Sequence, residues 1–567
     1  VISKDHTLRI TAMGRQPFLA NANIGVEGPV QVRLRIRTAK NGEGRLQWRT
    51  KDQEGFPETG QRKSFLINGG EWRELAVPLN VKGQLLHLRL VLPAQEEPID
   101  MDWIEIRSAD ENAKATKRWD FNTSTPSPSV KPTKQPNVIL ILADDLGYGE
   151  LGCYGAPNVR TPHMDSLAAQ GVRCTDGYAA FPVCSPSRAA ILTGRYPARF
   201  GPTYEDYYGG GAPELDPIKH PIIAQMMKDA GYRTGCFGKW NVSNLNRRPA
   251  NDFGFDRWVG LHLNHDFYTH KVVRTGELDM YENGKKLERA GIWSDTIFTN
   301  EAISFIKAES KKPFFIYLPF QAPHTPIQDP DVPMDKPQEK NRQTLIKMIE
   351  RLDHEIGRIL KALNDEKLVD NTLVILTSDN GGEQKIARNL PLNGAKQMLL
   401  EGGIRVPLIL RWPVVLPAGR EFSMPISAMD LTATIATAAG VKSLPDKLFD
   451  GVDLVPALKG KLELDYDRPL FFRRRNVSVR EGLNAIRQSA VRKGDWKYLR
   501  TYRPVGSGKY EAALYNLKKD IGEKKNEAAA YPEVVEGMSD LLGQWEHEMS
   551  KTAESFPEVL PRKKTRK

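Results

Sequence analysis

The sequence predicts an α/β protein with a large central, mostly parallel sheet flanked by helices, an N-terminal all-β sandwich and a small C-terminal α+β subdomain. Three observations predict it. Alternating apolar and polar residues occupy the first part of the chain, as in Val30–Arg37. Continuous apolar runs that end in aspartates follow, as in residues 137–145. Alternation is typical of half-buried strands, and continuous runs are typical of buried parallel strands. Short strand-like runs and a helical pattern over about residues 532–549 end the chain.

The length of the chain and its changes in composition predict separate domains. At 567 residues the chain is too long for a single hydrophobic core. Residues 123–135 are rich in proline and serine, which is typical of a linker. We therefore expect a β-sandwich accessory domain over residues 1–122, the linker, an α/β domain over residues 136–440 and a C-terminal subdomain over residues 441–567.

The first domain is predicted from its alternating runs, which are Val30–Arg37, 85–92, 99–106 and a last strand over 118–121. Several such strands separated by polar turns favour an antiparallel sandwich. In this general texture the domain is similar to carbohydrate-binding sandwiches. Trp48, Trp72 and Trp103 would then form either a sugar platform or part of the core and the domain interface, and packing is the favoured interpretation.

The most informative segment of the α/β domain is residues 181–195, FPVCSPSRAAILTGR. Pro186 lacks a backbone N–H and fixes its own φ, so it suits the start of a helix, which we expect over residues 187–192. The first turn of a helix offers unpaired N–H groups and positive dipole character to an anion. Arg188 adds a fixed cation beside Cys184. The alternative is a small buried thiol before an ordinary helix.

Two predicted strands end in polar oxygen donors. Asp144 and Asp145 follow the apolar run after Asn137, and Asp379 and Asn380 follow Thr372–Ser378. Open α/β sheets bind ligands at the carboxyl ends of their strands. Three carboxylates and one amide form a hard, all-oxygen set that suits calcium or magnesium and not zinc. The alternative for each aspartate is a helix cap or a turn.

With these segments in order, the chain resembles the formylglycine-dependent (type I) sulfatases of the alkaline phosphatase superfamily, from about Asn137 to the C-terminal region. Their C-x-P-S-R-x-x-x-L-T-G-R pattern marks the cysteine that is oxidised to formylglycine, and Cys184 occupies that position. The resemblance implies that Cys184 is the nucleophile, that Arg188 is its cation, and that the metal is calcium. The implied ligands are Asp144, Asp145, Cys184, Asp379 and Asn380.

The resemblance also implies a division of labour in the reaction. Asp379 would activate one hydroxyl of the hydrated formylglycine for attack on sulfur, and the second hydroxyl would later expel sulfate. The sulfate charge would be neutralised by calcium and three cations, which are Arg188, Lys239 and Lys396. His324, as imidazolium or together with Lys396, would protonate the leaving oxygen.

One position departs from the family pattern. The segment 238–241 reads Gly-Lys-Trp-Asn, where the family has histidine last. Asn241 can form hydrogen bonds but cannot accept a proton at neutral pH. One interpretation is that Asn241 keeps the geometry of the site while another group accepts the proton during sulfate elimination. The other is that it marks slow turnover or a reshaped pocket. Asn241 also begins an N-glycosylation sequon, which is accidental if Asn241 lies in the pocket.

The resemblance and the basic charge predict a sulfated glycan as substrate. We expect Asn241, His265, Asp266 and His270 to bind it, with His262, Asn264 and Tyr268 in the same polar segment. The alternative is that the segment consists of turn and core residues. The run 473–475, three arginines, would either reach the pocket or be solvated. Two rival functions are a phospho- or phosphonate monoester hydrolase and a non-catalytic protein that binds sulfated glycans.

Composition limits the remaining possibilities. The net charge is +11, and the terminal run 562–567 carries five of these charges, which leaves +6 on the rest. We find no nucleic-acid motif and no apolar run long enough to span a bilayer. Cys153, Cys174 and Cys236 are too few and too scattered for a disulfide framework. The family resemblance implies a periplasmic or secreted protein and a formylglycine-generating or sulfatase-maturing enzyme as its partner.

Overall fold

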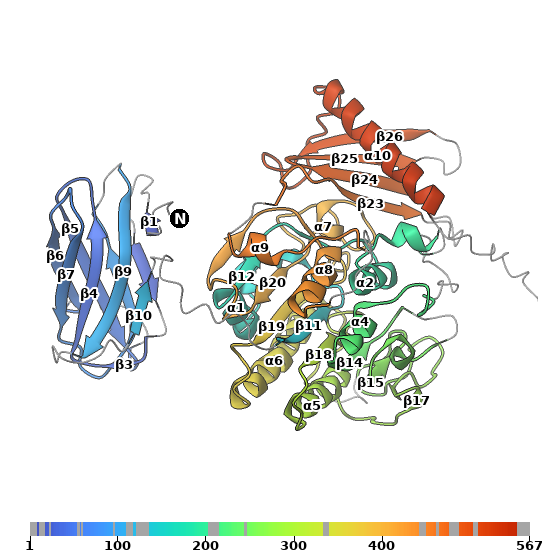
Figure 1. Cartoon of the computed structure of the whole chain (residues 1–567), viewed down its shortest axis with the longest axis horizontal. Coiled ribbons are helices and arrows are strands. Elements are labelled where there is room, and N and C mark those ends of the chain that lie inside the picture. Colours follow the sequence, from blue (N-terminus) through green and yellow to red (C-terminus); the bar gives the residue numbers. More distant parts are fainter. Residues whose placement is uncertain are drawn as a thin grey trace, which may run out of the picture. The chain divides into compact units, whose positions relative to one another are not determined.

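A computed structural model divides the chain into two units, Val1–Lys131 and Pro132–Lys567. It describes residues 8–10, 18–21, 24–53, 57, 60–93, 97–108, 117–120, 135–201, 204, 215–242, 247–332, 339–441, 449–460, 464–475, 487–502 and 509–552. Of the predicted linker only Gln135 is among them, and the basic run 562–567 lies outside them. Figure 1 shows the elements of each unit in sequence colours.

The first unit contains, within its described residues, two antiparallel sheets of five strands each. One sheet holds β1 (Leu8–Ile10), β4 (Val30–Arg37), β7 (Arg73–Leu79), β9 (Ile99–Ser108) and β10 (Lys117–Asp120). The other holds β2 (Phe18–Asn21), β3 (Val26–Glu27), β5 (Gly42–Thr50), β6 (Arg62–Ile67) and β8 (Gln84–Val91). Val32 and Leu34 from the first sheet share a core with Leu46 and Trp48 from the second. The predicted sandwich is therefore confirmed, and Trp48 packs in its core.

The second unit is organised around a sheet that holds ten strands among the described residues, in the order β17-β16-β15-β14-β18-β11-β19-β20-β12-β21. Its members are β11 (Asn137–Ala143), β12 (Val172–Cys174), β14 (Arg233–Lys239), β15 (Arg257–Leu261), β16 (Tyr281–Glu282), β17 (Lys285–Lys286), β18 (Phe314–Pro319), β19 (Thr372–Ser378), β20 (Leu408–Arg411) and β21 (Arg420–Phe422). The central strands β15, β14, β18, β11 and β19 run parallel. A short parallel pair, β13 (Gly177–Tyr178) and β22 (Ile426–Ser427), lies outside this sheet.

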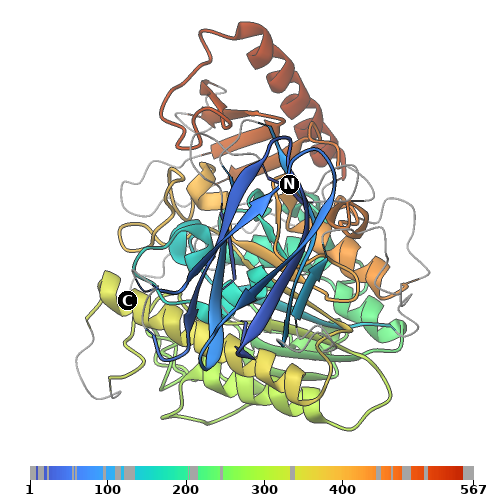
Figure 2. The same cartoon turned by 90° about the vertical axis from the view of Figure 1, so that its left-hand side faces the viewer.

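Helices cover both faces of this sheet (Figure 1). Their bounds are α1 (Pro162–Ala169), α2 (Cys184–Thr193), α4 (Ile223–Asp229), α5 (Ser294–Lys307), α6 (Arg342–Asp365), α7 (Glu401–Ile404), α8 (Met429–Ala438) and α9 (Val455–Leu458). Alternate residues of β11 divide between the layers: Leu140 packs with α2, α4 and α8, whereas Ile139 packs with α1, α5 and α6. The helices α5 and α6 lie side by side (Figure 2). The predicted α/β fold is confirmed.

Helix α2 begins earlier than the sequence predicts. We expected the helix over residues 187–192, and it runs over Cys184–Thr193. Pro186 thus lies inside the first turn, where a missing N–H removes no helical hydrogen bond. Cys184 is therefore a helical residue in the first turn of α2.

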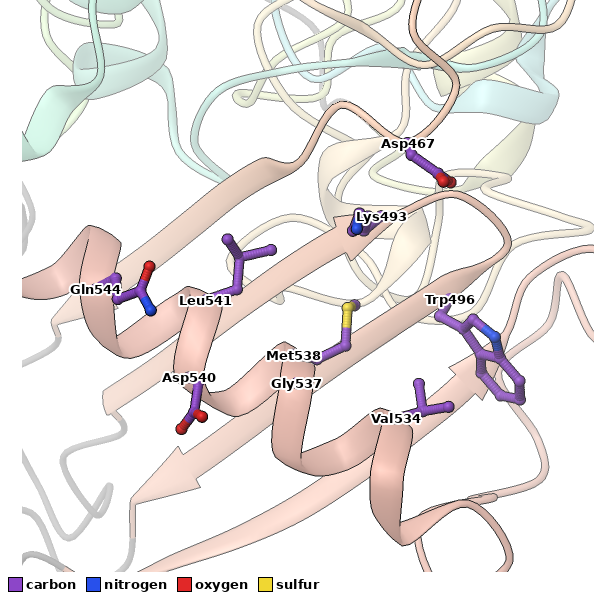
Figure 3. Close-up of a pocket in the computed structure, with 9 residues that line it drawn as sticks. All are labelled: Asp467, Lys493, Trp496, Val534, Gly537, Met538, Asp540, Leu541 and Gln544. Carbon is purple, nitrogen blue, oxygen red and sulfur yellow. The ribbon is translucent and has the colours of Figure 1, made fainter.

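The C-terminal subdomain has the predicted small antiparallel sheet and terminal helix. Its elements are β23 (Leu470–Arg475), β24 (Arg487–Lys493), β25 (Trp496–Tyr502), β26 (Tyr510–Asn516) and α10 (Pro532–Thr552). Met538 and Trp545 of α10 pack on Phe471 and Val491 of the sheet. A hollow of about 460 Å³ lies beside α10, and Trp496 is among its lining residues (Figure 3).

Buried charges join this subdomain to the α/β domain. Lys497 of β25 is fully buried, and its Nζ lies 3.0 Å from Glu401 Oε1 and 2.8 Å from Glu523 Oε1. Glu401 opens α7 and also accepts hydrogen bonds from the Tyr178 hydroxyl, at 2.6 Å, and from Arg405, at 3.3 Å. Since each acid has cationic partners, the pairs hold α7 against β25 without an uncompensated charge.

We expect Lys497→Met to lower the free energy of unfolding of the second unit by about 3–5 kcal/mol, because it leaves Glu401 and Glu523 buried without their shared cation. Urea unfolding followed by tryptophan fluorescence measures the change. Lys519→Met is the matched control, since Lys519 is exposed and should change stability by less than about 0.5 kcal/mol. Equal stabilities of the two variants would contradict the interpretation.

Candidate active site

The carboxyl ends of β11 and β19 bring four polar residues together. The two strands are adjacent and parallel, with Ala143 opposite Ser378, so the aspartates that follow each strand start at the same level. The Asp145 N–H donates to Asp379 Oδ1 at 3.1 Å, and Asn380 Nδ2 donates to Asp145 Oδ1 at 2.7 Å. The sequence argument that these strand ends meet is therefore correct in geometry.

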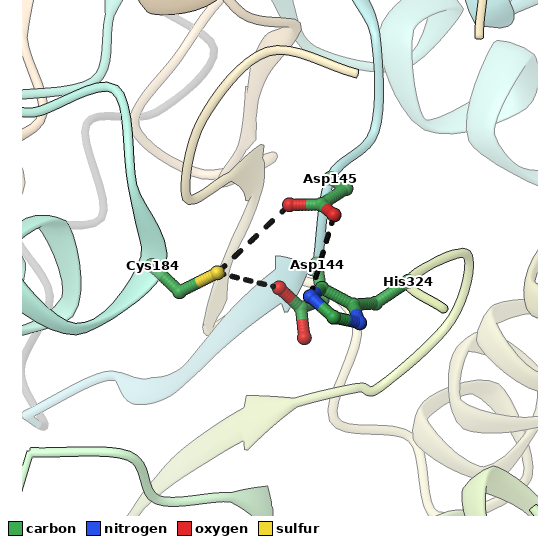
Figure 4. Close-up of side chains that lie close together, drawn as sticks. All are labelled: Asp144, Asp145, Cys184 and His324. Atoms are coloured by element: carbon green, nitrogen blue, oxygen red, sulfur yellow. Dashed lines mark hydrogen bonds and ion pairs between the residues drawn. The ribbon is translucent and has the colours of Figure 1, made fainter. Parts of the chain in front are cut away.

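Cys184 faces this edge of the sheet from the first turn of α2. Its Sγ lies 3.2 Å from Asp144 Oδ1 and 3.9 Å from Asp145 Oδ1 (Figure 4). Burial and the neighbouring Asp144 and Asp379 carboxylates raise the pKa of the thiol well above its usual value. The thiol therefore donates to a carboxylate at neutral pH.

Arg188, one turn further along α2, is fully buried and reaches the same carboxylates. Its Nε and Nη2 donate to Asp379 Oδ2 at 2.9 and 2.7 Å, and its Nη2 lies 3.3 Å from Asp144 Oδ1. Nη1 donates to the Lys239 carbonyl at 3.0 Å. This fork fixes the guanidinium between β19 and β14, which gives a cation of defined orientation beside Cys184.

Two lysines complete the ring of charges. Lys239, at the end of β14, places Nζ 2.6 Å from Asp144 Oδ2, and Lys396 places Nζ 2.6 Å from Asp145 Oδ2. Burial opposes the charge on both lysines, but the facing carboxylates raise the pKa of each above its usual value. Both amines are therefore ammonium ions at neutral pH.

The carboxylates differ in their pKa. Although burial opposes ionisation, Lys239, His324 and Arg188 hold the pKa of Asp144 well below its usual value. Burial and Asp144 raise the pKa of Asp379, against the effect of Arg188. A raised pKa makes Asp379 the stronger base of the two.

His324 approaches Asp145 from the loop after β18. Its Nε2 lies 3.5 Å from Asp145 Oδ2 (Figure 4). The same Nε2 lies 3.3 Å from Asn264 Nδ2, and Nδ1 lies 2.6 Å from the Thr325 carbonyl. Burial, reinforced by Lys396 and opposed by Asp144 and Asp145, lowers the pKa of His324 to about 4. The ring is neutral at neutral pH, with Nδ1–H donated to the carbonyl and a lone pair on Nε2.

The cluster contains a group of side chains that could hold a metal ion. One ligand atom each from Asp144, Asp145, Cys184 and His324 lie within 4.8 Å of one another. Asn380 Oδ1 is buried and accepts no hydrogen bond, although an unpaired buried amide oxygen is unfavourable in a protein interior. An oxygen left without a donor beside carboxylates is the atom that a Ca²⁺ or Mg²⁺ ion binds.

Asn241 lies at the bend that follows β14. It is 3% exposed and has a left-handed φ of +52°, which asparagine tolerates better than most residues. Its Nδ2 donates to the His262 carbonyl at 3.2 Å, and its own carbonyl accepts a hydrogen bond from the Ser185 hydroxyl at 2.6 Å. Asn241 therefore ties the start of α2 to the end of β15.

We expect Asn241→His to lower kcat/KM without a gain in kcat, because the buried site has adapted to the smaller amide and the ring would lose the bond to His262. Steady-state kinetics on a sulfate ester measure both constants. A rise in kcat in the histidine variant, with a burst of alcohol release in the parent enzyme, would instead show that sulfate elimination is slow because Asn241 cannot accept a proton.

The other predicted substrate-binding residues have hydrogen-bond partners outside the charged cluster. His265 is fully buried with Nδ1 2.9 Å from the Asp279 carbonyl, and His270 Nε2 lies 2.9 Å from the Ile292 carbonyl. Asp266 accepts hydrogen bonds from the Thr269 N–H at 2.8 Å and from Gln328 at 2.5 Å. Asn264 is the member of the segment that contacts the cluster, through His324. The substrate-binding role of His265, Asp266 and His270 stays a prediction.

The rest of the polar segment and the arginine run have packing environments. His262 and Tyr268 stack edge-on against Trp258 and Trp293, respectively. Arg473 and Arg474 are 5% and 7% exposed, and the Arg473 guanidinium lies 5.3 Å from the Trp545 ring centre. Buried arginines do not form a solvated run, so that alternative is wrong for these two residues.

One residue with a clear effect on the site has no signal in the sequence. Asp295, in the first turn of α5, accepts the backbone N–H groups of Gln321 and Ala322, both at 3.0 Å. These bonds hold the start of the loop that carries His324. Asp295 lies in no recognisable motif, and only the tertiary contact between α5 and the loop reveals its role.

The four cysteines of the chain, all in its described part, are free. Among the described residues, no helix is both long enough and apolar enough to cross a membrane.

Known proteins with similar sequences are sulfatases. A family model described as Sulfatase matches residues 136–441, and one described as N-sulphoglucosamine sulphohydrolase, C-terminal, matches residues 394–548. An N-acetylgalactosamine-6-O-sulfatase of Bacteroides thetaiotaomicron is 31% identical over 498 residues, which cover 72% of this chain and 93% of that protein. Human N-acetylgalactosamine-6-sulfatase is 33% identical over 367 residues, with coverage of 60% and 68%.

Solved structures give the same result for the fold. The crystal structure of Ps i-CgsB has 31% sequence identity and a TM-score of 0.64, and the match covers 73% of this chain and 93% of that chain. The same protein has been solved in complex with k-i-k-neocarrahexaose. Both family matches begin after the first unit, Val1–Lys131. The chain belongs to the type I sulfatases of the alkaline phosphatase superfamily and is a sulfuric ester hydrolase.

Proposed function

We propose that the protein hydrolyses sulfate esters of a sulfated carbohydrate at the site formed by Cys184, Asp144, Asp145 and Asp379. The observation that carries the proposal is the position of Cys184 in the first turn of α2, 3.2 Å from Asp144 and one helical turn from Arg188. This places the residue that the family oxidises to formylglycine against the carboxylates that would hold a metal ion.

The two groups that the family adds would supply chemistry that the side chains lack. Oxidation of Cys184 to formylglycine supplies a hydrated aldehyde with two hydroxyls on one carbon. Calcium, held by Asp144, Asp145, Asp379, Asn380 and residue 184, supplies a Lewis acid for the sulfate oxygens. The orphaned Asn380 Oδ1 supports calcium, because a hard oxygen donor suits Ca²⁺ better than Zn²⁺.

Charge balance explains the preference for an anion. Three carboxylates of Asp144, Asp145 and Asp379 face three cations of Arg188, Lys239 and Lys396 at distances of 2.6 to 3.3 Å. The cluster is therefore close to neutral by itself, and a divalent ion would make it positive. The ammonium groups of Lys239 and Lys396 would then also attract the sulfate oxygens.

Proton transfer is assigned from the pKa directions. The raised pKa of Asp379 suits a base for the attacking hydroxyl. For the leaving oxygen, the neutral His324 ring carries its proton on Nδ1, which faces a backbone carbonyl. Lys396 carries its proton at neutral pH, so we assign it as the donor to the leaving oxygen and His324 as its neighbour on the same side.

Carbohydrate substrates are supported by the relatives. The similar proteins include N-acetylgalactosamine-6-sulfatases, and a similar solved structure is a complex with k-i-k-neocarrahexaose. We extend the sugar class to this chain, with Asn241 and Asn264 beside the cluster as groups that would contact the sugar. Oxidation of Cys184 would require a formylglycine-generating or sulfatase-maturing enzyme as a partner. We also propose a periplasmic or secreted location, in keeping with sulfated polysaccharide substrates.

The test of the proposed reaction compares matched sulfate and phosphate monoesters. We expect kcat/KM to be at least about 100-fold higher for the sulfate ester of the same alcohol, because the site would be built for a singly charged ester. A preference for the phosphate or phosphonate ester would support that alternative and contradict the proposal. Sulfate release from N-acetylgalactosamine-6-sulfate and from carrageenan oligosaccharides then tests the sugar class.

The metal prediction is specific to Asn380. Removal of calcium with EGTA should abolish activity, and addition of calcium in excess of the chelator should restore it. Asn380→Leu deletes the orphaned oxygen, so we expect the calcium concentration for half-maximal activity to rise by about 10- to 100-fold. Asn300→Leu is the control, because Asn300 is exposed on α5 and accepts a hydrogen bond from Arg358, outside the cluster. Activity that survives EGTA, or that returns only with zinc, would contradict the calcium assignment.

A further inference from the structure

A buried carboxylate holds the loop that leads from β18 to His324. Asp295 of α5 is fully buried, and each of its oxygens accepts one backbone N–H, both at 3.0 Å. Oδ1 accepts the N–H of Gln321 and Oδ2 that of Ala322. An ionised carboxylate has an acceptor oxygen for each donor, whereas an amide would turn its own N–H groups towards one of them.

The carbonyls of the same two loop residues reach the charged cluster. The Ala322 carbonyl accepts the Asp144 N–H at 3.2 Å, and the Gln321 carbonyl accepts the His324 N–H at 2.9 Å. Ala322 therefore joins Asp295 to Asp144 of the cluster, and Gln321 joins it to His324. A shift of this loop would move a proposed calcium ligand and the histidine beside the leaving oxygen together.

The side chain of Gln321 extends the connection to the polar segment after β15. Its Nε2 donates to the His265 carbonyl at 2.6 Å, and its Oε1 accepts the His265 N–H at 3.3 Å. The preceding residue, Asn264, contacts the His324 ring, with Nδ2 3.3 Å from Nε2. The loop held by Asp295 thus links the end of β11 with the segment that carries Asn264.

The surroundings of Asp295 are unfavourable for a carboxylate. Burial raises the pKa of Asp295 to about 7 against the two N–H bonds, and the negative charges of Glu355 and Asp144 add to the effect of burial. Burial of an acid near other acids costs free energy, and such costs are characteristic of functional sites.

We infer that Asp295 is a positioning residue for sulfate ester hydrolysis. Through the backbone of residues 321–324, its carboxylate fixes Asp144 for the metal ion and His324 beside the leaving oxygen. The inference rests on the proposed function, because it concerns the reaction at that cluster. Partners of this kind, one step behind the ligands, orient the groups that bind a metal ion.

The chain offers a matched control in Asp353 of α6. Asp353 is 2% exposed, and its Oδ1 accepts the backbone N–H groups of His163 at 3.1 Å and Met164 at 2.8 Å. Burial raises the pKa of Asp353 to about 6. Asp353 therefore shares the burial and the type of bonds of Asp295, but it holds the start of α1 and not the loop of His324.

The experiment compares Asp295→Asn with Asp353→Asn in preparations of the full chain with equal conversion of Cys184. Hydrogen–deuterium exchange with mass spectrometry measures the exposure of residues 321–324. Calorimetric titration of EGTA-treated protein with CaCl₂ gives the calcium dissociation constant. Steady-state kinetics at saturating calcium give kcat and KM for 4-nitrophenyl sulfate and for a sugar sulfate. The parent protein tests the proposed function by itself, because its turnover and its calcium requirement involve no variant.

For Asp295→Asn we expect amide exchange in residues 321–324 to become at least about tenfold faster, because one of the two bonds is lost. Calcium should bind about 10- to 100-fold more weakly, and kcat should fall by about 10- to 100-fold. The fall in kcat should be larger for the sugar sulfate, because His324 lies beside the leaving oxygen. Asp353→Asn should lower the thermal midpoint similarly but keep calcium affinity and kcat within about twofold of the parent.

Equal kcat values and equal calcium affinities in the two folded variants would overturn the inference. Unchanged exchange of residues 321–324 in Asp295→Asn would overturn it as well. If Asp295→Asn does not fold, Asp295→Glu takes its place, since it keeps the charge and both oxygens but moves them by one methylene. It should show the same losses, and parental calcium affinity and kcat in Asp295→Glu would equally contradict the positioning role.

Discussion

Replacement of Cys184 by alanine or serine is expected to reduce turnover by about 10⁴- to 10⁶-fold, the loss that follows removal of a covalent nucleophile. Alanine has no heteroatom on its β-carbon and serine carries a single hydroxyl there, so neither side chain as such provides the pair of hydroxyls that attack sulfur and later expel sulfate. Hydrolysis of 4-nitrophenyl sulfate under saturating calcium measures the effect.

The fold should survive both replacements. Serine keeps a hydroxyl that can donate to Asp144, as the thiol does at 3.2 Å, and alanine removes one small atom from the first turn of α2. Circular dichroism and the thermal midpoint should match those of the parent. Cys153→Ala is the control, because Cys153 is half-buried outside the motif and should retain full activity. Substantial activity in folded Cys184→Ala protein would exclude Cys184 as the nucleophile.

The second large effect is expected for Lys396→Met. Lys396 is 8% exposed, with Nζ 2.6 Å from Asp145, and the variant removes the cation assigned to the leaving oxygen. We expect kcat to fall by about 10²- to 10³-fold, which is typical for loss of one preorganised donor. The loss should be larger for a sugar sulfate than for 4-nitrophenyl sulfate, because a poor leaving group depends more on proton donation.

Lys385→Met provides the control for this prediction. Lys385 is exposed in the segment before Lys396, so its loss should leave kcat within about twofold. An equal loss for both leaving groups in Lys396→Met would assign Lys396 to the sulfate oxygens alone. A similar fall in His324→Ala, with the same dependence on the leaving group and none in Lys396→Met, would transfer the donor role to His324.

Much of the fold follows from local patterns. The runs that became β11 and β19 are apolar over their whole length because the sheet is covered on both faces, and the bounds of β4 match the alternating run Val30–Arg37. The meeting of Asp144 with Asp379 was predictable because parallel strands share a carboxyl edge. These inferences need only the period of the sequence and the rules of α/β sheets.

Other features depend on contacts between distant segments. Nothing near Asp295 in the sequence shows that it holds the loop of His324, and nothing near Lys497 shows that it would pair with Glu401. The polar segment around His265 has the composition of a sugar subsite, yet the fold turns its imidazole towards the Asp279 carbonyl. Composition shows which side chains are present, whereas the burial of each side chain and the direction in which it points depend on tertiary packing.

The central claim is that sulfate ester hydrolysis runs through converted Cys184. The most direct test is peptide mass spectrometry of the segment around Cys184 in several preparations that differ in maturation, with the fraction of CH₂SH replaced by CHO plotted against specific activity. The account predicts a proportional line through the origin. Full activity in a preparation whose Cys184 remains a thiol would contradict it.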